Sequence, residues 1–172
     1  MFDYNIVLIG FMGAGKSTVA DCLSARYAME TVEMDQVIEE RQAMSIRDIF
    51  AVHGEEYFRD LETQLLIELK DQKNTVISCG GGAVLRERNV DEMKKNGRVV
   101  LLTASPKTVY ERVKDSSGRP VLKGRKNVKD IEELMEQRRE KYEAAADIVV
   151  NTDNKTIPAV CEELIQRLRE ME

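Results

Sequence analysis

The stretch that most constrains this chain is GFMGAGKST at residues 10–18, which directly follows the apolar run NIVLI at residues 5–9. It fits the pattern G-x-x-x-x-G-K-[ST] between a predicted strand and a predicted helix, a context that disfavours a chance glycine-rich turn. The fixed positions fall on Gly10, Gly15, Lys16 and Ser17. Backbone N–H groups of such a loop surround phosphate oxygens, and the helix start adds a partial positive charge. The stretch therefore predicts a bound nucleoside triphosphate, with Lys16 on the transferred phosphate and Ser17 on Mg²⁺.

Composition narrows the class of protein. A length of 172 residues is typical of one domain. The chain has 26 Lys and Arg and 31 Asp and Glu residues, and the resulting net charge of −5 argues against a nucleic-acid-binding surface. No apolar run approaches the roughly 20 residues of a membrane span, and we expect no signal peptide. Three separated cysteines and one histidine match no disulfide or zinc pattern. We expect a cytoplasmic monomer without nucleic-acid or membrane partners.

Short runs rich in β-branched residues alternate with longer helical patterns. Strands are predicted at Asn5–Ile9 and Thr75–Ser78, and at residues 31–34, 98–103 and 147–151. Helices are predicted at Lys16–Tyr27, Ile46–His53, Glu87–Lys95 and Val128–Ala145, and at residues 35–42, 55–70, 106–114 and 158–170. Ser105 and Thr156 cap two helix starts that contain proline, and Gly97 marks a helix end. The alternation predicts an α/β fold in which a parallel sheet carries helices on both faces.

Two regions exceed this simple plan. Residues 35–70 hold three helical pieces between two strands, more than one crossover needs. Residues 115–127, DSSGRPVLKGRKN, are polar and interrupted by glycine and proline, which predicts a mobile loop. No linker divides the chain, so we predict a single domain over residues 1–172.

Two carboxylates follow the second predicted strand. Glu33 and Asp35 lie two residues apart, so both can face the crevice at the carboxyl end of the sheet. There, one could support Mg²⁺ and the other could accept hydrogen bonds from a substrate hydroxyl. An acidic, solvated helix start with Asp35 as its cap is equally compatible with the pattern.

Arg59 and a triple glycine are the next candidates. Arg59 lies three residues before Glu62 in a helical run, and most such arginines are solvated or paired on the surface. The triple glycine Gly80, Gly81 and Gly82 follows a strand directly, where it costs backbone entropy and contributes no packing. A ligand that approaches this backbone closely explains it better than a tight turn, which needs fewer glycines.

Further arginines occur toward the C-terminus. Arg119 lies in the predicted loop, and loops that close over phosphates often bring an arginine to the transferred charge, although a solvated loop arginine fits as well. Arg138 and Arg139 lie in a highly charged helical run, where most charges face water.

Six motifs occur in order along the chain: GFMGAGKST, EMDQVIE, YFRDLE, CGGGAV, GRPVL and LMEQRREKY. In order and spacing they resemble the shikimate kinase family over nearly the whole chain. The resemblance implies a P-loop kinase of the nucleoside-monophosphate-kinase type: a three-layer α/β fold with a five-stranded parallel sheet. It also implies a substrate-binding helical region at residues 35–70 and a lid at residues 115–127. The implied reaction transfers the γ-phosphoryl group of ATP to the 3-hydroxyl of shikimate with Mg²⁺ as cofactor, on the route to chorismate and the aromatic amino acids.

The resemblance also implies roles for single residues. The ATP-binding set is Gly13, Ala14, Gly15, Lys16, Ser17, Thr18, Arg119 and Arg112, the last matching a basic residue that stacks on adenine. The catalytic set is Lys16, Asp35 and Arg119, with Asp35 polarising or deprotonating the acceptor. The shikimate-binding set is Asp35, Arg59, Gly80, Gly81, Gly82 and Arg138, with the arginines on the carboxylate. The metal set is Ser17 and, through water, Glu33, which is one methylene longer than the aspartate usual in the family.

The chemistry of these residues agrees with the resemblance, because paired arginines bind carboxylates through bidentate forks and an aspartate binds neighbouring hydroxyls. Two other functions are compatible with the phosphate loop. A gluconate kinase also phosphorylates a polyhydroxy acid, but the triple glycine with Arg59 and Arg138 disfavours it. A guanine-nucleotide switch would need an NKxD motif, whereas NKTI at residues 154–157 ends in isoleucine and DSSG at residues 115–118 follows a helix.

Overall fold

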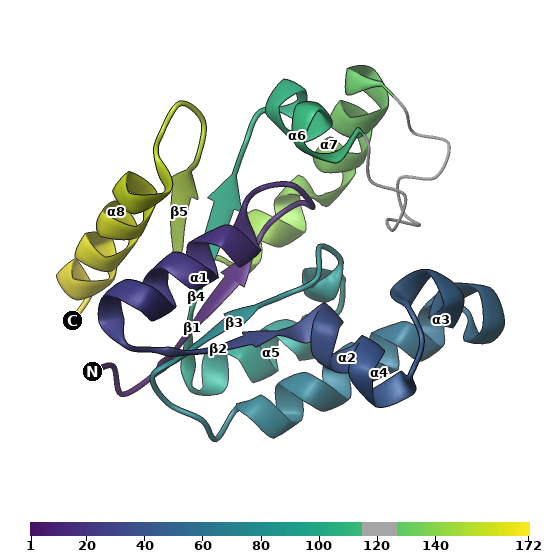
Figure 1. The fold of residues 1–172 in the computed structure, drawn as a ribbon, viewed down its shortest axis with the longest axis horizontal. Helices are drawn as coiled ribbons and strands as arrows, with labels where there is room; N and C mark the ends of the chain where they lie inside the picture. Colours follow the sequence, from purple (N-terminus) through teal and green to yellow (C-terminus); the bar gives the residue numbers. More distant parts are fainter. Residues whose placement is uncertain (115–126) are drawn as a thin grey trace.

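A computed structural model describes residues 1–114 and 127–172 of the chain (Figure 1). The predicted lid at residues 115–127 therefore lies outside the described residues except for Asn127, and Arg119 lies outside them too. In the described ranges, every helix is too short or too polar to span a lipid bilayer.

The centre of the fold is, as predicted, a parallel sheet of five strands. Their order in the sheet is β2-β3-β1-β4-β5. The strands are β1 (Asn5–Ile9), β2 (Glu30–Glu33), β3 (Thr75–Ser78), β4 (Gly97–Thr103) and β5 (Ile148–Asn151). The central strand β1 pairs with β3 on one side, Val7 opposite Ile77, and with β4 on the other, Val7 opposite Val99. Because β1 and its neighbours are buried on both faces, their sequences are continuously apolar instead of alternating.

Helices connect the strands at nearly the predicted positions. They are α1 (Lys16–Tyr27), α2 (Met34–Gln42), α3 (Ile46–His53), α4 (Glu55–Leu69), α5 (Glu87–Lys95), α6 (Pro106–Val113), α7 (Val128–Ala145) and α8 (Ile157–Glu170). A short 3₁₀ turn, η1 (Ala83–Leu85), follows the triple glycine and was not predicted. Ser105 and Thr156 cap α6 and α8 as predicted, accepting hydrogen bonds from the backbone N–H groups of Thr108 and Ala159.

The sheet divides the interior into two apolar cores. Alternate residues of the strands, such as Leu8 and Val100, pack with α1 and α8 on one face. Their neighbours, such as Ile9 and Leu101, pack with α4, α5 and α7 on the other face. Figure 1 shows α1 and α8 together on one side of the sheet, and the group α2, α3 and α4 projecting at the right of the view. The three layers and the extra helical group agree with the predicted architecture.

Gly97 follows the end of α5, as predicted, but glycine is needed here for close packing and not to end the helix. The helix ends at Lys95, and Gly97 opens β4 without the positive φ of a helix-terminating glycine. A Cβ atom here would overlap the carbonyl oxygen of Met93 and lie 2.9 Å from Cγ2 of Val7. Close packing between the helix end and β1 therefore requires glycine.

We expect Gly97→Ala to lower the free energy of unfolding by about 1–3 kcal/mol, because the added methyl group meets backbone that cannot move aside cheaply. Asp91→Ala, on the exposed face of α5, is the control and should change it by no more than about 0.5 kcal/mol. Urea unfolding followed by circular dichroism measures both. Equal stability of the two variants would contradict the packing explanation.

Candidate active site

The phosphate loop connects β1 to α1 and has the backbone that the motif predicts. Gly10, Gly13 and Gly15 have positive φ angles of 150°, 81° and 98°, which residues with a Cβ atom rarely adopt. A Cβ atom at Gly13 would also lie only 2.8 Å from Cγ1 of Val113. The loop is therefore shaped by its glycines, and its amide groups are presented at the first turn of α1.

Lys16 lies across this loop. Its Nζ atom donates hydrogen bonds to the carbonyl oxygens of Gly10 and Phe11, at 2.7 and 3.0 Å. Ser17 and Thr18 follow as exposed residues in the first turn of α1, which contains no acidic residue to offset the helix dipole. A lysine, two hydroxyl groups and the positive end of a helix thus converge where a phosphate chain can bind.

Arg112 on α6 adds a second positive charge beside the loop. Its Nη1 atom donates a hydrogen bond to the carbonyl oxygen of Gly13 at 2.7 Å, and its side chain is exposed. It therefore lies on the donor side of the site, where the predicted ATP contact can be made.

Glu33 and Asp35 lie at the carboxyl end of the sheet. Glu33 is the last residue of β2 and precedes α2, whereas Asp35 is inside the first turn of that helix and is not its N-cap. The interpretation of Asp35 as a helix cap is therefore wrong. Burial raises the pKa of the Cys79 thiol, and the charges that act on this thiol include Lys16, Asp35 and Glu33. Both carboxylates and the lysine of the phosphate loop therefore act electrostatically on the same buried thiol.

Arg59 is buried, in contrast to the solvated arginine that its helical spacing favours. Its side chain is on α4, and its Nη1 atom is 2.8 Å from Oε1 of Glu62, whereas its Nη2 atom is 3.1 Å from Oε1 of Glu55. Arg59 is 7% exposed and Glu62 is 0% exposed. The i to i+3 pair that the sequence suggested is real, but it lies inside the protein.

The triple glycine makes room for these charged side chains. A Cβ atom at Gly80 would be 2.8 Å from Oδ1 of Asp35 and 2.9 Å from Oε2 of Glu62, and one at Gly82 would overlap the guanidinium of Arg59. At two of the three glycines, side chains of the site itself therefore approach the backbone closely. The ligand contact inferred from the sequence stays a prediction.

Arg138 on α7 completes the group of buried charges. It is 6% exposed, and its guanidinium lies 5.9 Å from the centre of the Phe11 ring. Its Nη1 atom is 3.7 Å from the position of a Cβ atom on Gly81, and this nitrogen is buried without a hydrogen-bond partner among the described residues. The neighbouring Arg139 is exposed and pairs with Glu136 at 2.8 Å. The structure thus separates two adjacent arginines into one in the site and one on the surface.

The sequence prediction omitted two residues of this site. Burial raises the pKa of Glu62 from 4.5 to about 7, against the opposing effect of the Arg59 guanidinium. Tyr142 donates a hydrogen bond from its hydroxyl to the carbonyl oxygen of Gly81. The available signals were spacings: Glu62 is three residues after Arg59, and Tyr142 is four residues after Arg138, so each pair shares a helix face.

The described residues contain no group of three or more His, Cys, Asp or Glu side chains that could hold a metal ion by themselves. One oxygen of Glu33, Oε1, is nevertheless buried with no hydrogen-bond partner in the described part of the chain. An oxygen of this kind suits a hydrated Mg²⁺ that takes most of its ligands from phosphates and water.

The fold and the phosphate loop together define a P-loop kinase. Residues 12–169 match the family model described as shikimate kinase. The shikimate kinase of Persephonella marina is 43% identical over 96% of this chain and 99% of that protein, and one from Dehalococcoides mccartyi is 42% identical over 98% and 95%. The chain belongs to the shikimate kinase family, whose members are ATP-dependent kinases.

Solved structures agree with this assignment. The shikimate kinase from Acinetobacter baumannii in complex with shikimate has a TM-score of 0.93 at 30% identity and covers 98% of this chain and 94% of its own. That from Aquifex aeolicus has a TM-score of 0.82 at 38% identity, with 96% of each chain covered. A gluconokinase from Sinorhizobium meliloti, at a TM-score of 0.61 and 16% identity, shares the fold alone.

The buried carboxyl of Glu62 makes stability depend on pH. Its pKa is higher in the folded chain, about 7, than its ordinary value of 4.5, so the folded chain binds more protons than the unfolded chain between these values. The free energy of unfolding should therefore fall as the pH rises through this window, by about 1–3 kcal/mol from this group.

Glu62→Gln removes the titrating group and should lose this part of the pH dependence, although it also weakens the pairing with Arg59. Urea unfolding of both proteins at about pH 5 and about pH 7.5 gives the comparison. A stability difference between the two proteins that is the same at both pH values would contradict the raised pKa.

Proposed function

We propose that this chain transfers the γ-phosphoryl group of ATP to the 3-hydroxyl of shikimate, and that it does so as a monomer in the cytoplasm. The observation that carries the proposal is the pair of buried guanidinium groups at the triple glycine. Arg59 is held there by Glu62, and Nη1 of Arg138 has no hydrogen-bond partner among the described residues. Two buried cations beside the glycine backbone suit a small carboxylate. The similar shikimate kinase from Acinetobacter baumannii was solved in complex with shikimate, which supports this acceptor.

On the acceptor side, the arginines Arg59 and Arg138 would bind the carboxylate, and the glycine backbone would contact the ring. Asp35 would accept a hydrogen bond from the reacting hydroxyl and polarise or deprotonate it. Its Oδ1 atom lies 2.8 Å from the position of a Cβ atom on Gly80, next to the backbone proposed to contact the ring. A carboxylate at hydrogen-bond distance from the reacting hydroxyl would act as the general base.

On the donor side, the amides of the loop and Lys16 would hold the ATP phosphates, together with Gly13, Ala14, Gly15, Ser17 and Thr18. Arg112 would contact the nucleotide from α6, and Arg119, outside the described residues, would approach the transferred phosphate. Lys16 would exchange its bonds to the loop carbonyls for phosphate oxygens. Catalysis would consist mainly of positioning and charge stabilisation.

Mg²⁺ would be held by the hydroxyl of Ser17 and, through water, by Glu33. The buried, unpartnered Oε1 of Glu33 supports this assignment. Bound Mg²⁺ supplies neutralisation of charge on the β- and γ-phosphates.

A coupled assay of ADP release with shikimate, gluconate, quinate and no acceptor tests the proposed function. We expect turnover with shikimate well above the other three reactions. Turnover with gluconate but none with shikimate would overturn the proposal.

The arginine assignment gives a sharper prediction. Arg138→Ala should raise the KM for shikimate by about 10- to 100-fold with little change in the KM for ATP, because it removes charge-assisted hydrogen bonds to the carboxylate. Arg139→Ala, one residue away on the exposed face of α7, is the matched control and should leave both constants within about twofold. Similar effects in the two variants would exclude a specific role for Arg138.

A further inference from the structure

Tyr142 connects α7 to the middle residue of the triple glycine. Its hydroxyl donates a hydrogen bond of 2.5 Å to the carbonyl oxygen of Gly81, across 61 residues of sequence. The residue is 6% exposed and lies one helical turn after Arg138, so both side chains leave the same face of α7. Helix α7, which carries Arg138, thus also holds the backbone of Gly81 in place.

The other glycine carbonyls are bonded locally. The carbonyl oxygen of Gly80 accepts from the N–H group of Ala83 at 3.1 Å, in the turn that leads into η1, and that of Gly82 accepts from the N–H group of Leu85 at 3.1 Å, in η1 itself. Gly81 receives its hydrogen bond from Tyr142 instead. Because glycine has the widest backbone freedom of any residue, a bond from outside the turn is an effective way to fix its peptide group.

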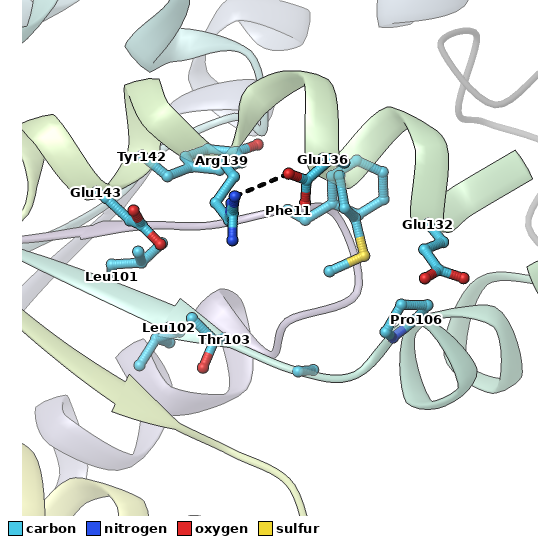
Figure 2. A pocket seen from close by; sticks show the side chains of 12 residues that line it. Phe11, Leu101, Leu102, Thr103, Pro106, Glu132, Glu136, Arg139, Tyr142 and Glu143 are labelled. Carbon is cyan, nitrogen blue, oxygen red and sulfur yellow. Dashed lines mark ion pairs between the residues drawn. The ribbon is translucent and has the colours of Figure 1, made fainter. Parts of the chain in front are cut away.

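The other side of the Tyr142 ring faces a cavity of about 300 Å³ between α7 and β4. Figure 2 shows Tyr142 with Arg139 and Glu136 along α7, opposite Leu102 and Thr103 on β4. Phe11, whose ring lies beside the Arg138 guanidinium, lines the same cavity. Packing alone therefore leaves the ring room to shift toward the cavity, and the hydroxyl bond to Gly81 opposes that shift.

We propose that Tyr142 is a positioning residue for the acceptor: its hydroxyl fixes the Gly81 peptide against Arg138, so that the acceptor carboxylate and ring meet a preformed surface. The inference rests on the proposed function, since it assumes that Arg138 and Gly81 contact shikimate. Burial raises the pKa of Tyr142, and although Arg138 opposes this effect, the hydroxyl keeps its proton and remains a donor at neutral pH.

Tyr142→Phe keeps the ring and removes the hydroxyl, and with it the hydrogen bond to Gly81 and the contact of the hydroxyl with Arg138. We expect the KM for shikimate to rise about tenfold, with the KM for ATP within about twofold of wild type. Tyr4→Phe is the matched control, since Tyr4 donates its hydroxyl to Glu172 at the opposite end of the chain, and it should leave both constants unchanged. A folded Tyr142→Phe variant with unchanged KM for shikimate, or one in which both KM values rise equally, would overturn the proposal.

Two further measurements show whether a change in the KM for shikimate comes from unfolding of the variant or from a wrong assignment of the substrate. Thermal unfolding of each variant reports whether it is folded, and Tyr142→Met, whose flexible side chain can fill the same space, carries the same expectation if the phenylalanine variant does not fold. Turnover of shikimate by the wild-type protein is measured in the same assay. Its absence would contradict the proposed function, whereas normal wild-type turnover with an unaffected Tyr142→Phe variant would contradict the positioning role alone.

Discussion

The proposed acceptor side of this molecule depends on the buried ion pair between Arg59 and Glu62. Burial of a guanidinium is costly unless it is paired and hydrogen-bonded, and removal of one partner of a buried pair typically costs about 3–5 kcal/mol. The pair lies within one helix, α4, and it fits there because Gly80 and Gly82 present no side chain toward it. The ion pair and the position of α4 therefore both depend on these glycines. A side chain added at either glycine would displace the charged groups.

The parallel sheet brings this acceptor side to the phosphate loop. Both the loop and the triple glycine follow adjacent strands, β1 and β3, and the carboxyl ends of parallel strands meet at one edge of a sheet. The buried thiol of Cys79 directly follows β3, and the charges of Glu62, Lys16 and Asp35 all act on it. Lys16 and Asp35, the proposed donor and acceptor residues, thus influence one buried group although they come from different parts of the chain. Arg138 and Tyr142 extend the same arrangement to α7.

Much of this could be predicted from the sequence because the signals are local. Continuous apolar runs predicted the buried strands, and the glycine and lysine spacing predicted the phosphate loop. The burial of Arg59 could not be predicted, because a solvated ion pair and a buried ion pair have the same i to i+3 spacing. The burial depends on the turn at residues 80–82, which is distant in the sequence. Likewise, the adjacent positions of two arginines on α7 did not show that Arg138 is buried near Phe11 whereas Arg139 is exposed. The turn η1 has three residues, too few for any periodicity.

In the proposed function, Glu62, the glycines and Phe11 position Arg59 and Arg138 before shikimate binds. Crystal structures of the chain with and without shikimate test it most directly. We predict that the guanidinium groups of Arg59 and Arg138 occupy the same positions in both within about 1 Å, as preorganised sites do. Reorientation of either guanidinium by several ångströms, or loss of the Arg59–Glu62 pair in the shikimate-free crystal, would contradict the account.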